Sequence, residues 1–258
     1  MKKRVVSLFS GVGGLDLGFE QAGYQVELLC EKDGFAQAVL GEQFTDVNIE
    51  SDICDLKSLP EVDVVTAGFP CQDLSQAGRK AGISGSESGL VSNLFRLLAL
   101  YETKKAPTVV IENVPYMLRL NRGEAMRALI RSFEELGYKW AYRIVDARAF
   151  GVPQRRPRLI MVAAQEFHPK DILFDRESIP AFKDPRPGVV DESAAYGFYW
   201  TEGSRGVGWT LEGVPPIKGG SSVGIPSSPA VWIPAADFAG TLDVYDAERI
   251  QGFPGDWT

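Results

Sequence analysis

The sequence predicts an α/β protein with an open, parallel sheet and a smaller irregular region. Segments rich in β-branched residues alternate with segments of helical periodicity through residues 1–164. A glycine-rich turn follows the first strand, and residues 165–240 lose the alternation and become rich in Pro and Gly. The predicted strands are 4–10, 26–30, 62–67, 108–111 and 159–164. The predicted helices are 15–22, 35–44, 90–101 and 123–136.

Composition limits the class of protein. The 258 residues are 45% hydrophobic, enough for one large domain or a large and a small one. The apolar runs are shorter than a membrane span, and residues 1–4 lead into a strand without a cleavable apolar segment, so we expect a soluble, cytoplasmic protein without membrane contact. Three cysteines and the single His168 are too few for a disulfide framework or a zinc site, and no metal is expected. The net charge of -7 argues against sequence-blind binding of nucleic acid over the whole surface, but leaves room for a local basic patch.

The first strand is followed by glycines at positions 11, 13 and 14 and then by an amphipathic helix. A strand, a glycine turn and a helix open a nucleotide-binding unit, because missing side chains let a ligand approach the backbone and the helix N-terminus. Many glycine turns only allow a helix and a strand to pack closely, and this alternative stays open.

Acidic residues follow the next two strands. Glu31 ends the second strand, where its carboxylate can accept hydrogen bonds from both hydroxyls of a ribose. The alternative is an acid that starts the next helix, a role that Asp33 also fits. Asp52 and Ile53 follow a third short strand, where the carboxylate can bind an adenine amino group and the isoleucine can cover the ring. A capped turn with a core isoleucine explains this pair equally well.

A buried strand ends at Gly68 and delivers Pro70 and Cys71 into a loop. Open α/β sheets carry their chemistry at the carboxyl ends of strands. Because Pro70 fixes the backbone and a polar loop keeps the sulfur accessible, the Cys71 thiol is a candidate nucleophile. Taken alone, a buried and inert cysteine is the commoner interpretation. The glycine-rich residues 75–89 are typical of a lid over a substrate or of an ordinary surface connection.

Glu112 follows another buried strand, so a parallel sheet places it at the same edge as Cys71. A lone glutamate at a strand end is usually solvated. One opposite a cysteine in a cleft can have its pKa raised and serve as an acid.

An arginine-rich run lies between Arg143 and Arg158, with five arginines against one acid, Asp146. Arginine clusters suit phosphate backbones or a carbonyl on a base. The usual alternative is a solvated charge run, although prolines hold this one rigid.

Five motifs occur in order: Phe9-Ser10-Gly11-Val12-Gly13-Gly14, Gly68-Phe69-Pro70-Cys71-Gln72, Glu112-Asn113-Val114, Gln154-Arg155-Arg156-Pro157-Arg158 and Arg249-Ile250-Gln251-Gly252-Phe253-Pro254. In order and spacing they resemble the signature of the DNA (cytosine-5) methyltransferase family. The match covers residues 1–164 and 241–257.

The resemblance implies a doubly wound, mostly parallel sheet in a cofactor-binding and catalytic domain over 1–164. It also implies a small target-recognition region over 165–240 and a return segment toward the catalytic domain over 241–258. It also implies S-adenosylmethionine as the cofactor. The implied cofactor contacts are Phe9, Gly11, Gly13 and Gly14 at the methionine end, Glu31 at the ribose, Asp52 and Ile53 at the adenine, and Pro70 and Leu90 around the pocket. Ser7 stands where members commonly have an acid and Glu87 where a basic residue is frequent, and either departure is expected to weaken contacts.

The resemblance further implies methyl transfer to carbon 5 of a cytosine that is flipped out of double-stranded DNA, as in restriction-modification. Cys71 would add to carbon 6, and Glu112 in its protonated form would hold the N3 edge. Arg156 and Arg158 would steady the pyrimidine carbonyl and the flipped nucleotide. The implied DNA contacts are Ser75 and Arg155. A prokaryotic member would be associated with the nucleoid.

Two parts of the sequence differ from what surrounds them. Residues 165–240 lack the alternation of strands and helices, and the C-terminal end lacks a motif that is common in the family. Residues 165–240 carry Trp200, Trp209 and Trp232 in polar loops that suit base contacts, with an irregular structural subdomain as the alternative. Members normally continue after the last motif with a glycine-asparagine motif on a helix that covers the cofactor site, whereas this chain stops at Thr258. We expect either a shortened chain or a second polypeptide that supplies the motif, and therefore weak cofactor binding by this chain alone.

Two other functions stay open at this point. One is an RNA cytosine-5 methyltransferase with the same chemistry, and the other is a subunit that binds DNA or cofactor without turnover. A nicotinamide dehydrogenase is disfavoured because the glycine spacing differs from the fingerprint of those enzymes.

Overall fold

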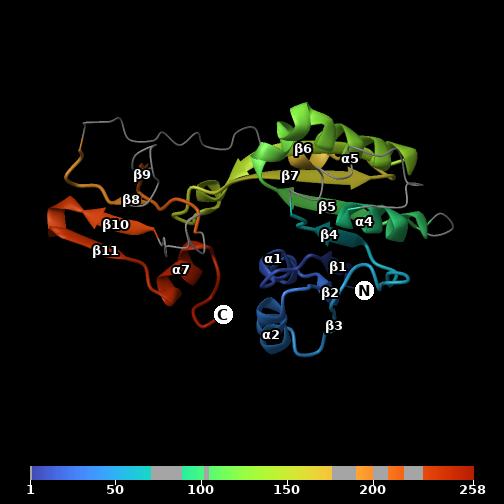
Figure 1. Ribbon diagram of the computed structural model, residues 1–258, viewed down its shortest axis with the longest axis horizontal. Helices are drawn as coiled ribbons and strands as arrows, with labels where there is room; N and C mark the ends of the chain where they lie inside the picture. The colour runs from blue at the N-terminus through green and yellow to red at the C-terminus, as the bar shows by residue number, and fades with distance from the viewer. Residues whose placement is uncertain (1, 71–88, 102–104, 176–189, 200–208, 218–228) are drawn as a thin grey trace. The chain divides into compact units, whose positions relative to one another are not determined.

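A computed structural model describes residues 2–70, 89–101, 105–175, 190–199, 209–217 and 229–258 (Figure 1). The chain divides into two compact units. The first comprises Met1–Ile144 and Arg158–Glu177, and the second comprises Val145–Pro157 and Ser178–Thr258.

A seven-stranded sheet with the strand order β3-β2-β1-β4-β5-β7-β6 forms the frame of the first unit (Figure 1). Its strands are β1 (Arg4–Leu8), β2 (Gln25–Cys30), β3 (Asn48–Glu50), β4 (Val64–Ala67), β5 (Thr108–Asn113), β6 (Lys139–Asp146) and β7 (Pro157–Ala164). Strands β3, β2, β1, β4 and β5 pair in parallel, whereas β7 runs antiparallel to β5. The strand order reverses between β1 and β4, and ligands of open α/β sheets bind at such switch points, beyond the carboxyl ends of the strands.

Helices pack on this sheet. They are α1 (Gly14–Gln21), α2 (Gly34–Gln43), α4 (Leu90–Ala99), α5 (Glu124–Glu135) and α6 (Lys170–Leu173), with 3-10 turns η1 (Pro115–Leu118) and η2 (Leu120–Gly123). The predicted strands and helices differ from the observed ones by at most two residues at either end. The predicted fold class, a doubly wound and mostly parallel sheet, is confirmed.

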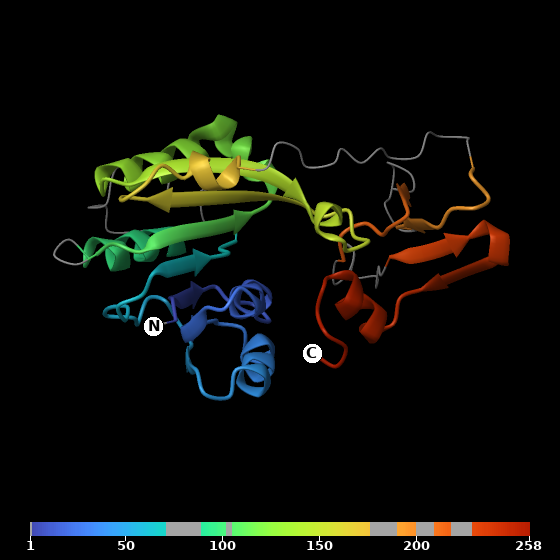
Figure 2. The ribbon, with the colours of Figure 1, turned by 180° about the vertical axis from the view of Figure 1, so that it is seen from behind.

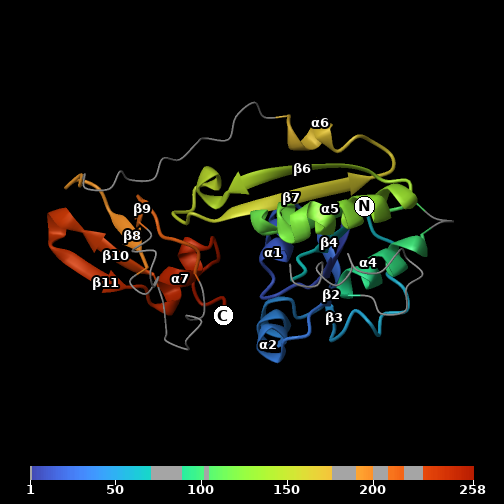
Figure 3. The same cartoon turned by 45° about the horizontal axis from the view of Figure 1, so that its top comes forward.

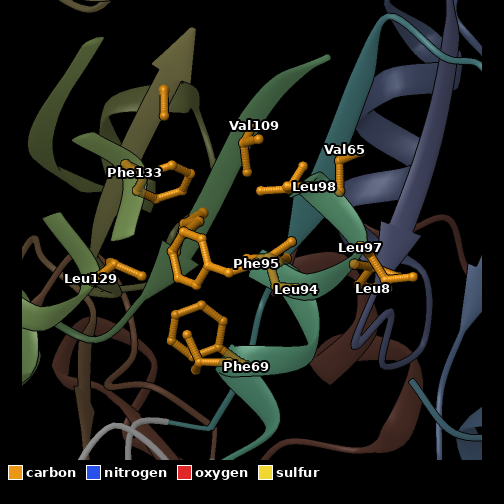
Figure 4. Close-up of a cluster of buried hydrophobic side chains, with 14 of the residues drawn as sticks. Leu8, Val65, Phe69, Leu94, Phe95, Leu97, Leu98, Val109, Leu129 and Phe133 are labelled. Carbon is orange, nitrogen blue, oxygen red and sulfur yellow. The ribbon is translucent and has the colours of Figure 1, made fainter. Parts of the chain in front are cut away.

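The main core lies between the sheet and the pair α4 and α5, which run side by side in Figure 3. Leu8, Val65 and Val109 come from three strands and share one cluster with side chains of both helices (Figure 4). Phe95 on α4 meets Phe133 on α5 edge to face, with 4.9 Å between ring centroids. This packing fixes α4 firmly against the strands that lead to the site.

The opposite face of the sheet carries α1. Side chains alternate along a strand, so Ser7 points away from the cluster that contains Leu8. The carboxyl group of Asp16 on α1 interacts with the Ser7 side chain, which places α1 on this second face. At the start of α2, the Asp33 carboxylate accepts a hydrogen bond from the Ala36 N–H at 2.9 Å, so the predicted capping role of Asp33 is confirmed.

The second unit contains a small antiparallel sheet with the order β11-β10-β8-β9; its red strand pair β10 and β11 is clear in Figure 2. The elements of the second unit are η3 (Ala147–Phe150), β8 (Tyr196–Phe198), β9 (Trp209–Leu211), β10 (Ala230–Ile233), η5 (Pro234–Ala236), β11 (Phe238–Thr241) and α7 (Val244–Ile250). The Pro- and Gly-rich composition of residues 165–240 predicts an irregular region, whereas the structure forms a small sheet there. Its strands of three or four residues are too short for an alternating pattern to stand out in the sequence.

The unit boundaries differ from the segment boundaries expected from the sequence. Residues 145–157 group with the second unit and 165–177 with the first, while 241–258 belong to the second unit. The roles expected for the three segments stay predictions. No helix in the described ranges is both long enough and apolar enough to cross a membrane.

Candidate active site

The carboxylate of Glu31 ties the end of β2 to the glycine turn that follows β1. It accepts hydrogen bonds from the backbone N–H of Gly11 at 2.7 Å and of Lys32 and Asp33 at 2.8 Å each. A carboxylate has about four acceptor positions, so three donors leave roughly one for a ligand. Glu31 is therefore part of the turn's own structure as well as a candidate ribose acceptor.

The glycines of the turn have different reasons to be there. Gly13 has φ +86°, and a Cβ on it would lie 2.6 Å from Cε2 of Phe44, so close packing requires a glycine. Gly11 also has a left-handed φ, of +57°, but a Cβ there would have no atom of the described residues within 4 Å. Gly14 begins α1. The packing explanation thus holds for Gly13, whereas Gly11 leaves open space beside the backbone.

Phe9 adopts φ 61°, a conformation that non-glycine residues rarely take. Its ring meets the ring of Phe69 edge to face, with centroids 6.1 Å apart. Next to it, Ser10 and Cys30 exchange hydrogen bonds at the ends of β1 and β2. Strained backbone of this kind concentrates at functional sites.

The Asp52–Cys54 turn follows β3. Asp52 accepts the Cys54 N–H at 2.9 Å and pairs with the Lys32 ammonium at 2.8 Å. The hydrogen bond from Lys32, followed by that from Cys54, lowers the pKa of Asp52 to about 2. Ile53 is buried in the core. The structure thus shows the capped turn with a core isoleucine, and the contact of this turn with adenine stays a prediction.

Glu112 and Arg158 are brought together at the end of β5. The Arg158 Nε lies 2.6 Å from Glu112 Oε1 in an ion pair whose side chains are 17% and 26% exposed. A Cβ built on Gly68 would lie 4.0 Å from Glu112 Oε2 and 3.6 Å from the Phe9 carbonyl oxygen. The ends of β1, β4 and β5 therefore converge, as the sequence predicted for Glu112 and the loop after β4.

Cys71, Ser75 and Glu87 lie outside the described residues. The described chain reaches Pro70, which is exposed, and resumes before Leu90, the first residue of α4, whose side chain packs partly against the core.

Asn113 is a candidate functional residue that sequence reasoning did not single out. Its side chain is buried and donates a hydrogen bond from Nδ2 to the Phe69 carbonyl at 2.9 Å, while its Oδ1 accepts the Val114 N–H at 2.9 Å. This amide joins the end of β5 to the backbone just before Pro70. The available signal was a polar residue at the buried end of a strand.

Asp16 was also missed. It is fully buried in the first turn of α1, and neither carboxyl oxygen has a hydrogen bond of normal geometry among the described residues. Burial raises the pKa of Asp16 to about 7, although its interaction with the Ser7 side chain lowers it in part. Ser7 itself is buried. Ser7 occupies the position where members of the family that the sequence resembles commonly have an acid. In this chain the acid beside that position is Asp16, which comes from α1.

The arginine run is largely held by protein groups. Arg148 pairs with Asp146 at 2.9 Å; burial pushes the Asp146 pKa up, but the hydrogen bonds from Arg148 outweigh this and lower it. Arg143 donates to the Leu173 carbonyl at 2.9 Å. With Arg158 paired to Glu112, at least three of the five arginines have protein partners. The run is therefore neither a solvated stripe nor a uniform phosphate-binding patch.

Arg155 and Arg156 belong to the second unit. The Arg156 N–H donates to Asp146 Oδ1 at 3.4 Å and its carbonyl accepts the Ala147 N–H at 3.2 Å. The Arg155 N–H donates to the Val214 carbonyl at 2.8 Å. The backbones of both arginines are thus fixed, and their roles toward cytosine and DNA stay predictions.

Residues 3–195 match the family model of the C-5 cytosine-specific DNA methylases. The chain belongs to this family. The resemblance seen in the sequence motifs is thereby confirmed.

Two curated proteins illustrate how similar this chain is to known methyltransferases. It is 58% identical over 256 residues to the Type II methyltransferase M2.BsuMI of Bacillus subtilis (strain 168), a match that covers 99% of this chain and 66% of that protein. It is 34% identical over 190 residues to M.NgoFVII of Neisseria gonorrhoeae, covering 72% of this chain and 47% of that protein. The chain thus spans between about half and two thirds of the length of these relatives.

Solved structures support the fold. A crystal structure of the S. pombe Dnmt2 methyltransferase superimposes with a TM-score of 0.52 at 18% identity, covering 69% of this chain and 57% of that one. A putative DNA modification methyltransferase encoded within an E. coli prophage gives a TM-score of 0.51 at 22% identity, covering 74% of this chain and 57% of that one.

Proposed function

We propose that this chain carries the catalytic region of a DNA (cytosine-5) methyltransferase, which moves a methyl group from S-adenosylmethionine to carbon 5 of a cytosine. One observation carries the proposal. The Gly11–Glu31 bond lies where β1 and β2 end, and the Glu112–Arg158 pair lies where β5 ends and β7 begins. Strand β4 lies between β1 and β5 in the sheet, and the chain that follows it reaches Cys71. A cofactor site and a carboxyl group thus flank the exit of the candidate nucleophile.

The residues present fit S-adenosylmethionine. Gly11 leaves open space beside the backbone, and Glu31 keeps roughly one acceptor position for a ribose hydroxyl. If Glu31 accepts hydrogen bonds from both ribose hydroxyls, one hydroxyl must share an acceptor position of the carboxylate with a backbone N–H group. Asp52 has about two acceptor positions left for an adenine amino group. The other proposed cofactor contacts are Phe9, Gly13, Gly14, Ile53, Pro70 and Leu90.

The protein's part in the chemistry follows from the nature of cytosine. Carbon 5 is a poor nucleophile, and addition of the Cys71 sulfur to carbon 6 raises its electron density. Glu112 protonates or hydrogen-bonds N3 as the ring gains charge, with Oε2 as the atom nearer to β4. When bound, S-adenosylmethionine supplies the methyl group on a positively charged sulfur. Loss of the carbon 5 proton then releases Cys71.

The remaining predicted residues act on DNA. Arg156 and Arg158 steady the cytosine carbonyl and the flipped nucleotide, and Arg158 is already oriented by Glu112. Ser75 and Arg155 contact the DNA backbone. Because a stacked base is inaccessible, the cytosine must leave double-stranded DNA to reach Cys71. The expected second polypeptide has no support in the comparisons and stays a prediction from the sequence.

Covalent trapping tests the proposal. DNA that contains 5-fluorocytosine lacks the proton whose loss releases the enzyme, so the adduct should accumulate with S-adenosylmethionine present. We expect an adduct that resists denaturation with the wild-type chain and none with Cys71→Ser. An equal adduct in the variant, or transfer of labelled methyl groups to RNA in preference to DNA, would contradict the proposal. Bisulfite sequencing of DNA from cells that express the chain then identifies the target site.

A further inference from the structure

The Asp52–Cys54 turn is tied to its surroundings at every residue. Asp52 is held by Lys32 at 2.8 Å. The Ile53 carbonyl accepts a hydrogen bond from an Arg96 guanidinium nitrogen at 3.1 Å, and the Cys54 sulfur accepts one from Asn93 Nδ2 at 3.4 Å. The last two donors both come from α4.

Asn93 and Arg96 form a connected pair on one side of α4. Arg96 Nε donates to Asn93 Oδ1 at 3.1 Å, which orients the guanidinium toward Ile53 and the amide nitrogen toward Cys54. Residues three apart face each other on a helix, so this pairing needs no distortion. The other side of α4 is buried in the core through Leu94 and Leu97. The pair therefore stands on a rigid base.

The hydrogen bond from Arg96 should hold the turn more firmly than the ion pair from Lys32. The Lys32 side chain is 76% exposed, so water and salt screen its ion pair. The bond from Arg96 to Ile53 is partly buried and brings a charged donor to a backbone carbonyl. Bonds of that kind are among the stronger ones in proteins.

We infer that Asn93 and Arg96 are positioning residues that set the preference of the cofactor site for adenine, by holding the turn that carries Asp52. The inference rests on the proposed function, because that function brings adenine to this turn. Its physical basis is preorganisation. A carboxylate on a fixed turn accepts a hydrogen bond from an amino group but repels a carbonyl oxygen at the same place, whereas a carboxylate on a loose turn can move away from the carbonyl and so tolerates either group.

The test compares two ligands, S-adenosylhomocysteine and S-inosylhomocysteine, in which a carbonyl replaces the adenine amino group. The wild-type chain should bind the adenine ligand at least about tenfold more tightly. Arg96→Met keeps the length of the side chain but removes its donors, and we expect about tenfold weaker binding of S-adenosylhomocysteine with the preference largely lost. Asn93→Ala should act in the same direction with a smaller effect. Hydrogen exchange of the amides at 52–54 should accelerate in both variants without ligand.

Arg127→Met is the matched control. Arg127 also donates from its guanidinium to a backbone carbonyl, that of Arg122 at 3.1 Å, but on α5 rather than α4. This variant should keep both the affinity and the preference of the wild type. If Arg127→Met loses the preference as Arg96→Met does, any removal of a guanidinium group weakens the preference, and the inference is wrong.

The outcomes separate the inference from the function on which it rests. If the wild-type chain binds both ligands equally, the proposed contact between Asp52 and adenine is wrong, and the inference about Asn93 and Arg96 fails with it. If the wild type prefers the adenine ligand and both α4 variants keep that preference, only the inference is overturned. Should Arg96→Met fail to fold, Asn93→Ala decides by the same comparison.

Discussion

Asp16→Asn should change how the stability of the first unit depends on pH. Asp16 is buried, and burial raises its pKa from 3.8 to about 7. Interactions with the Ser7 side chain on β1 and with the backbone of Asp16 itself lower the pKa in part, and the charge of Glu20 on α1 raises it. The unfolded chain gives up this proton near pH 4, whereas the folded chain keeps it to about pH 7.

The sign follows from which state holds the proton. Between pH 4 and 7 folding takes up a proton, so the wild-type free energy of unfolding falls as the pH rises and levels off above 7. A shift of about 3 pKa units, at about 1.4 kcal/mol each, corresponds to on the order of 4 kcal/mol. The asparagine does not titrate, so the variant should gain about this amount over the wild type across the same window.

Urea unfolding from pH 4 to 8.5, followed by circular dichroism, measures the difference between the two proteins. Asp46→Asn is the control for the loss of one carboxylate, since Asp46 is an exposed acid of the same unit. A flat difference for Asp16→Asn would refute the reasoning, because it would mean that the folded protein leaves Asp16 ionised at no cost.

Three further predictions concern the site. Asn113→Ala removes the hydrogen bond to the Phe69 carbonyl, so adduct formation with 5-fluorocytosine DNA should slow by about 100-fold; an unchanged trapping rate would argue against a positioning role. Gly13→Ala should destabilise the chain by about 3 kcal/mol, from its left-handed φ and the overlap with α2, whereas Gly11→Ala should cost about 1 kcal/mol and mainly weaken S-adenosylhomocysteine binding. Thermal melts and calorimetry separate the two, and equal destabilisation would count against the packing argument. Glu112→Gln should lower methyl transfer about 100-fold or more, measured with labelled cofactor under single-turnover conditions, and a rate near wild type would remove Glu112 from the proposed chemistry.

Local pattern was enough to predict the sheet and the edge at which the site lies. The strands that carry Glu31, Gly68 and Glu112 are short, apolar and followed by turn residues, and a parallel arrangement brings their ends to one side. The same local logic identified Asp33 as a helix cap, because a cap depends only on the next three residues. Ordered motifs, rather than periodicity, carried the family assignment, which the family model confirms.

Long-range pairing was decided only by the tertiary structure. The partner of Glu112 is Arg158, because β7 lies antiparallel to β5 with Asn113 opposite Leu159, a register that no local pattern specifies. Asp16 is buried by the packing of α1 on the sheet, although an acid near a helix start is normally a surface residue.

The sequence by itself determined the strands, their exits and the kinds of chemical group at each exit. The tertiary structure decided which of those groups neutralise one another, which are buried and which keep acceptor capacity for a ligand. The physical reason is that strand and turn preferences depend on neighbouring residues, whereas the charge and hydrogen bonding of a side chain depend on atoms that other parts of the chain bring to it.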